Sequence, residues 1–133
     1  MRNSNHKPLG TARRGFTLIE LMVVMTIVSL LLTLAAPRYF RSIERSKETV
    51  LKANLAATRD ALDKFHGDTG RYPEQLRELV ERKYLRTLPW DPVVESSDNW
   101  VLVAPSDGQA GSVYDIHSAA EGAGLSGVPY AQW

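Results

Sequence analysis

Cysteine is absent from this sequence of 133 residues. The chain can therefore form no disulfide, no thiolate nucleophile and no cysteine-ligated metal centre. Histidine is scarce, and the three that occur, His6, His66 and His117, are far apart in the sequence. The chain also has no nucleophile-elbow serine, no glycine-rich phosphate loop and no His-x-x-x-His pair. These absences predict a protein that is not an enzyme and that has no catalytic residue and no cofactor.

Acidic residues are missing from residues 1–15, a segment that holds four of the sixteen lysines and arginines. The rest of the chain then has twelve basic residues against fifteen acidic ones. This balance argues against nucleic acid as a partner. A basic segment next to a membrane span is typical of the cytoplasmic side, so we expect residues 1–15 to stay in the cytoplasm.

An apolar run follows the basic segment. From Phe16 to Ala36 every residue is apolar, small or hydroxylated except Glu20. As a helix, 21 residues extend about 30 Å, which matches the hydrocarbon core of a bilayer. The run is longer than the apolar part of a secretory signal peptide and no small-residue cleavage site follows it. It predicts a membrane-spanning helix.

Glu20 is the exception within this run. A charged side chain inside a membrane segment costs at least about 2.5–3.5 kcal/mol, so it needs a partner. We expect no partner on the same helix. A cut after Gly15 would give Phe16 a free α-ammonium group, and Glu20 would pair with that group on a neighbouring subunit.

The sequence Gly15-Phe16-Thr17-Leu18-Ile19-Glu20 resembles the processing site of the type IV pilin superfamily. The basic leader, the glycine, the phenylalanine, the acid five residues into the mature chain and a proline, Pro37, all match. The resemblance implies that prepilin peptidase cuts between Gly15 and Phe16 and methylates the new amine. It also implies that Phe16, Glu20 and Pro37 serve assembly. A generic single-span anchor would explain the apolar run but neither Glu20 nor the glycine.

Helical spacing continues beyond Pro37, but the residues become amphipathic. Pro37 lacks a backbone N–H and should kink or unwind the helix near residues 33–36. Gly67 and Gly70 end the helix, which is then about fifty residues long. A short helix over residues 74–80 and two β-rich runs, 100–104 and 113–117, follow.

These elements predict an α+β fold, in which the short helix and a small antiparallel sheet pack on the C-terminal half of the long helix. We divide the chain into a cytoplasmic leader (1–15), a transmembrane and assembly helix (16–37) and an outer domain (38–133). The tail from Ser118 onward is expected to be a loop, anchored by Tyr130 or Trp133.

The C-terminal half resembles the major pseudopilins of type II secretion, through Gly70-Arg71-Tyr72-Pro73, a Leu-Pro-x-Asp-Pro segment at 88–92 and Tyr114-Asp115-Ile116. The resemblance implies a structural subunit of a periplasmic filament, anchored in the inner membrane by one span. Its implied partners are further copies of itself, prepilin peptidase, an inner-membrane assembly platform and minor pseudopilins.

One part of the chain departs from that family. Major pseudopilins typically hold calcium in their last loop with several acidic side chains, as a hard cation requires. Here Glu121 is the only acid from Ser118 to the end. We therefore expect no metal site, and packing of Tyr130 or Trp133 in its place.

Two other functions stay open at this point. One is a pilin of a type IV pilus or DNA-uptake system, and the other is a monomeric membrane-anchored module that binds a ligand. Basic residues that follow the span, Arg38, Arg41, Arg45 and Lys47, have two candidate partners. They would meet either lipid headgroups or acids of adjacent subunits, and the sequence does not decide between these.

Overall fold

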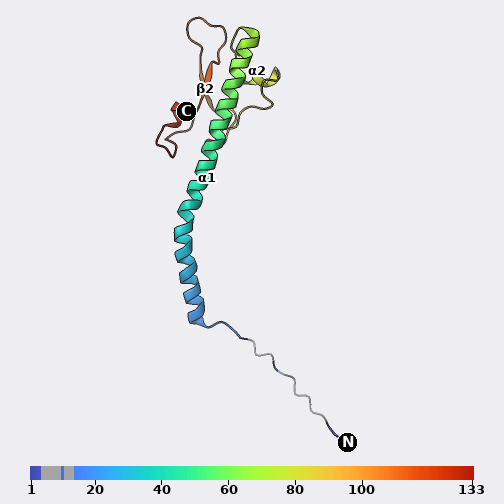
Figure 1. Cartoon of the computed structure of the whole chain (residues 1–133), viewed down its shortest axis with the longest axis vertical. Helices are drawn as coiled ribbons and strands as arrows, with labels where there is room; N and C mark the ends of the chain where they lie inside the picture. Colours follow the sequence, from blue (N-terminus) through green and yellow to red (C-terminus); the bar gives the residue numbers. More distant parts are fainter. Residues whose placement is uncertain (4–9, 11–13) are drawn as a thin grey trace. The chain divides into compact units, whose positions relative to one another are not determined.

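The computed structural model describes residues 1–3, 10 and 14–133. In chain order the elements are helix α1 (Leu18–Thr69), helix α2 (Leu76–Glu81), strands β1 (Trp100–Val103) and β2 (Asp115–Ser118), and the 3-10 turn η1 (Tyr130–Gln132) (Figure 1). They belong to two compact units, Met1–Arg38 and Tyr39–Trp133. The α+β fold class predicted from the sequence is confirmed.

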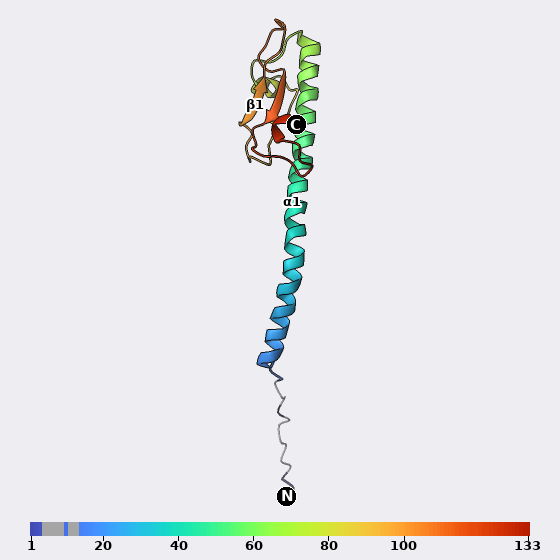
Figure 2. The same ribbon diagram turned by 90° about the vertical axis from the view of Figure 1, so that its left-hand side faces the viewer.

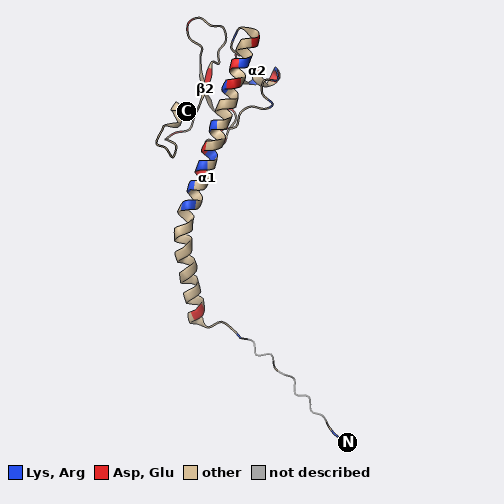
Figure 3. Ribbon diagram, in the orientation of Figure 1, with Lys and Arg blue, Asp and Glu red and all other residues tan. Residues whose placement is uncertain are grey.

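The first unit contains the start of α1. Its large apolar side chains from Leu18 to Leu34 are all exposed, and Figure 3 draws this part of the helix with no blue residue and with red only near its start. An 18-residue window within α1 has a mean hydropathy of 2.5, and none of it is buried. By length and composition this helix is able to cross a membrane.

Pro37 lies inside α1 and does not interrupt it. Residues 33–36 are helical, so the local unwinding expected there is wrong. The physical reason is that a proline removes only its own N–H bond to the carbonyl four residues earlier, while its neighbours keep theirs. Thr33 adds a side-chain bond, because its hydroxyl donates to the Ser29 carbonyl over 2.8 Å. A kink at Pro37 stays a prediction.

The second unit is built on residues 39–69 of α1. Figure 2 shows the strands, the loops and the C-terminus lying along this part of the helix. The core consists of helix residues at heptad-like spacing and apolar side chains from α2, the two strands and the loop before β2: Leu51, Leu55, Ala61, Leu62, Phe65, Leu76, Leu79, Trp100, Val113 and Ile116. Burying this apolar stripe is what holds the amphipathic half of α1 to the rest of the unit.

A turn joins α1 to α2. Gly70 has a φ of +74° and donates its N–H to the His66 carbonyl over 2.8 Å, which closes the helix with the left-handed residue that glycine supplies best. Tyr72 is buried and stacks on His66, with 4.3 Å between ring centroids. Arg71 forms an ion pair with Glu78 of α2. The turn therefore fixes the short helix against the long one.

β1 and β2 form a two-stranded antiparallel sheet in which Trp100 faces Ser118 and Val103 faces Asp115. The first strand begins where predicted and ends one residue earlier, whereas the second begins two residues later than the predicted run. Val113 and Ser112 both donate their N–H groups to the Pro73 carbonyl, at 2.9 and 3.1 Å. Val113 thus packs in the core from a loop and not from the sheet.

Candidate functional site

The junction between Gly15 and Phe16 lies outside regular structure. Helix α1 begins only at Leu18, and Phe16 is 90% exposed. Apart from Gly15 and its two chain neighbours, no described residue has an atom within 4 Å of the place where a Cβ on Gly15 would stand. Most of the leader before it, residues 4–9 and 11–13, lies outside the described residues. Among the described residues, none therefore packs over the bond between Gly15 and Phe16.

Glu20 and Thr17 cap the start of α1 reciprocally. The Thr17 N–H donates to Glu20 Oε2 over 3.0 Å, and the Glu20 N–H donates to Thr17 Oγ1 over 3.2 Å. This is a capping box, in which two backbone donors that no helical carbonyl can reach are satisfied by side chains. The carboxylate also lies at the positive end of the helix dipole.

The capping box corrects one expectation. Glu20 was expected to have no partner on its own helix, yet its Oε2 accepts a bond there. The Thr-x-x-Glu spacing in front of an apolar run is the signal that would have identified it. Oε1 of Glu20 has no hydrogen-bond partner among residues 14–133. One carboxylate oxygen is thus used locally, and the other remains available.

Gly15, Phe16 and Glu20 lie together at the start of α1, but Pro37 does not join them. It lies seventeen residues beyond Glu20 in the same helix, which corresponds to about 25 Å. Pro37 is therefore well separated from the Gly15–Phe16 bond.

A second group of polar contacts holds the C-terminal segment to α1. Glu48 is buried, and its Oε1 accepts the Leu125 N–H over 2.5 Å and the Tyr130 hydroxyl over 3.4 Å. Burial, together with the nearby Glu48 charge, raises the pKa of Tyr130 and so keeps its hydroxyl protonated as a donor. Gly124 has no room for a side chain, because a Cβ there would lie 2.8 Å from Glu48 Oε1 and 2.4 Å from the Trp133 ring.

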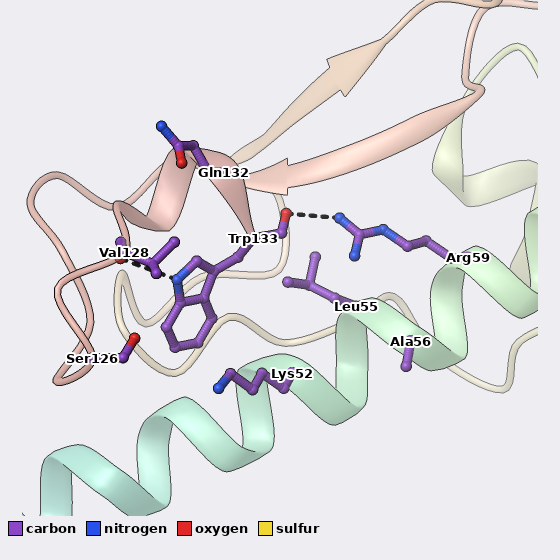
Figure 4. A pocket seen from close by; sticks show the side chains of 8 residues that line it. All are labelled: Lys52, Leu55, Ala56, Arg59, Ser126, Val128, Gln132 and Trp133. Atoms are coloured by element: carbon purple, nitrogen blue, oxygen red, sulfur yellow. Dashed lines mark hydrogen bonds between the residues drawn. The ribbon is translucent and has the colours of Figure 1, made fainter.

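Trp133 is fixed by three groups around a pocket of about 300 Å³ (Figure 4). Its indole N–H donates to the Val128 carbonyl over 3.2 Å, and Lys52 Nζ lies 4.6 Å from the centre of its ring. Arg59 donates to the Trp133 backbone oxygen over 2.7 Å and to Asp115 Oδ1 over 2.8 Å. The two cations of the pocket are thereby engaged in holding the tail.

Beyond β2 the tail is irregular, as expected of a loop, except for the short 3-10 turn η1. Tyr130 and Trp133 do anchor it, with 4.9 Å between their ring centroids. Its donor set does not suit calcium, which takes six to eight oxygen ligands with several carboxylates. Glu121 is exposed, and Glu48 is already bonded to the tail backbone.

Comparison of the sequence with known proteins identifies one matching family model and several similar proteins. Residues 10–36 match the family model for the prokaryotic N-terminal methylation motif. The chain is 35% identical to type II secretion system core protein G of Klebsiella pneumoniae, over 88% of each chain. It is 32% identical to the protein of that name from Escherichia coli K12, over 80% of this chain and 81% of the other.

A pilin is also similar to this chain. The type IV major pilin protein PilA of Myxococcus xanthus is 38% identical over 59% of this chain, but the match covers only 34% of the pilin. No solved structure matches. The similarity to core protein G thus extends through both units, whereas the similarity to the pilin is partial.

Proposed function

Because this chain belongs to the family of type II secretion system core protein G, the major pseudopilins, we propose that it is a structural subunit of a periplasmic pseudopilus. The observation that carries this proposal is a single carboxylate at the start of an exposed apolar helix, next to an uncovered Gly15–Phe16 bond. The proposed role is structural: the chain functions by assembling into a filament and not by catalysing a reaction.

The first step is insertion of the apolar run into the inner membrane. Residues 16–37 span it once, the basic leader stays in the cytoplasm, and residues 38–133 lie in the periplasm. In the inserted monomer the Thr17–Glu20 capping box satisfies the helix start. It leaves a carboxylate charge in lipid without a counter-ion.

The second step is processing. Prepilin peptidase cuts between Gly15 and Phe16 and methylates the new amine of Phe16. The chain is accessible at this junction because helix α1 starts two residues later. The cut removes every basic residue that precedes the span and leaves an ammonium group at its end.

The third step is polymerisation through α1. Glu20 keeps its Oε2 on Thr17 of its own chain and presents Oε1 to the Phe16 ammonium of a neighbouring subunit. Two buried charges that compensate each other only in the packed state would set the register of each added copy. The assembly platform and minor pseudopilins of the inner membrane are the further partners that this pathway requires.

Mass spectrometry of the protein isolated from its own cells tests the proposal. We expect a chain that begins at Phe16 and carries one N-terminal methyl group, and a chain that keeps its leader when prepilin peptidase is deleted. An intact leader in cells with an active peptidase would contradict it. Deletion of the gene should stop export of secreted proteins.

A type IV pilin is the second candidate, and the similarity to the Myxococcus pilin favours keeping it. That role predicts long surface fibres, or loss of DNA uptake on deletion while secretion continues. A monomeric binding module predicts neither result. It also predicts that cysteines introduced at residues 18–40 produce no ladder of crosslinked oligomers.

A further inference from the structure

Exposed arginines follow the apolar run of α1. Arg41 comes five residues after Ala36, the last residue of that run, and Arg45 comes one helical turn later. Both side chains are exposed. Two exposed guanidinium groups thus lie shortly after the end of the predicted span.

Unlike Arg41 and Arg45, five basic residues of the second unit are paired with carboxylates. Arg59, Arg71 and Lys64 each have a carboxylate oxygen within 4.0 Å, and so do Arg82 and Lys47. Neither Arg41 nor Arg45 has such a neighbour among the residues that the structure describes. Glu44 lies between them in the sequence but is in no ion pair there.

Aromatic side chains occupy the same stretch of helix. Tyr39 is 65% exposed and Phe40 62% exposed, and their rings contact each other edge to face with 5.9 Å between centroids. Such rings are largely apolar and are readily desolvated. Tyrosine in particular is enriched at the membrane–water interface. Basic and aromatic residues just after an apolar span are typical of a segment that lies at the membrane–water interface.

We propose that Arg41 and Arg45 bind the phosphate groups of anionic phospholipids at the outer surface of the membrane. The planar guanidinium group suits a phosphate because it donates two parallel hydrogen bonds. Helical side chains lean toward the helix N-terminus, which brings these groups back toward the lipid. The interfacial aromatic pair favours lipid over acids of a second copy. This inference rests on the membrane insertion proposed above.

Native mass spectrometry of the full chain in a neutral detergent tests the inference, with equal amounts of phosphatidylglycerol and phosphatidylcholine added. The wild-type chain should retain phosphatidylglycerol preferentially. In the double variant Arg41→Gln/Arg45→Gln this preference should fall by about thirtyfold, the change that corresponds to about 1 kcal/mol for each arginine near an anionic surface.

The matched control is Arg77→Gln/Arg86→Gln. These two arginines are also exposed and form no ion pair within the described residues, so the control removes the same charge from the same unit. It should keep the preference. An equal loss in both variants would overturn the inference, and so would full displacement of the lipid by inorganic phosphate.

Flotation separates this inference from the proposed function. Wild-type chain that floats with phosphatidylcholine vesicles has its span in the membrane. If it floats but shows no preference for phosphatidylglycerol, the headgroup site is refuted while the span stands. If the double variant keeps its lipid preference but loses crosslinks between copies, the arginines bind a second subunit and the inference is likewise refuted.

Discussion

The two carboxylate oxygens of Glu20 differ, because one caps its own helix and the other accepts no hydrogen bond from any residue that the structure describes. Glutamine can replace glutamate in a capping box but carries no charge. We expect Glu20→Gln to insert and to be processed normally, and yet to lower the assembled fraction about tenfold or more, since an unpaired buried charge costs about 3 kcal/mol or more. Filaments sheared from cells give the measurement.

Thr17→Val is the complementary variant. It removes the cap and keeps the charge, so it should cost about 1 kcal/mol at the helix start and leave assembly largely intact. Wild-type filament levels from Glu20→Gln, or equal losses from the two variants, would show that the charge does not select the neighbour.

Glu48 provides a second prediction at the scale of single residues. Glu48→Ala leaves the Leu125 N–H without its acceptor, and we expect a loss of about 1–3 kcal/mol in the free energy of unfolding. Hydrogen exchange should accelerate at residues 124–133. Glu44→Ala is the control, because Glu44 is exposed one turn earlier. Equal effects of the two changes would rule out an anchoring role for Glu48.

Glu44 and Glu48 are four residues apart and so share one helix face, which gives no sign that their roles differ. Helical spacing reports which residues share a face, but the partner of Glu48 lies 77 residues away along the chain. Glu20 shows the opposite case. Its capping bonds join residues three apart, and a local motif encodes them.

The turn between α1 and α2 carries a prediction at the scale of elements. The Arg71 guanidinium lowers the pKa of the Glu78 carboxyl, and the Glu74 N–H, 2.9 Å away, acts in the same direction. Because the folded pKa lies below the ordinary value of 4.5, the contribution to stability is complete above about pH 4.5. It is lost as the pH falls through the lowered value.

Melting temperatures across pH give the measurement for this turn. Glu78→Gln should lower stability by about 1–2 kcal/mol near neutral pH. The difference from wild type should shrink below about pH 4.5. Glu81→Gln, which changes an exposed carboxylate of the same helix, should have little effect at any pH. A constant deficit down to acid pH would assign the loss to packing and not to charge.

The elements were predictable where their cause is local. The spacing of apolar residues, Gly70 at the helix end and the β-branched run at β1 each identify an element from its own residues. β2 begins later than predicted because Val113, although β-branched, binds the distant Pro73 carbonyl. Its propensity for a strand is overridden by a contact that no sequence window contains.

For the whole molecule, the family was evident from the N-terminal motif, whereas the way the tail is held was not. Tyr130 and Trp133 were expected to anchor it because aromatic side chains bury large areas even from an irregular segment. The Arg59 and Lys52 contacts to Trp133 join residues more than seventy positions apart, so the pocket of Figure 4 appears only in the folded unit.

The absence of cysteine permits a direct test of polymerisation, because the chain then contains no thiol other than those introduced. If subunits add in a head-to-tail manner, two different surfaces of each copy meet. A chain with both Leu21→Cys and Val23→Cys, two exposed positions on opposite faces of α1, should then form a ladder of oligomers on oxidation in membranes. Each single variant should stop at dimers.

Adding Glu20→Gln to the double-cysteine chain is the decisive control. The ladder should then shrink toward monomer if the carboxylate pairs with the amine of the next subunit and so holds the start of each helix beside its neighbour. Expression without prepilin peptidase should have the same effect, because that amine is then never released. A full ladder under both conditions would mean that apolar packing alone sets the register of the subunits.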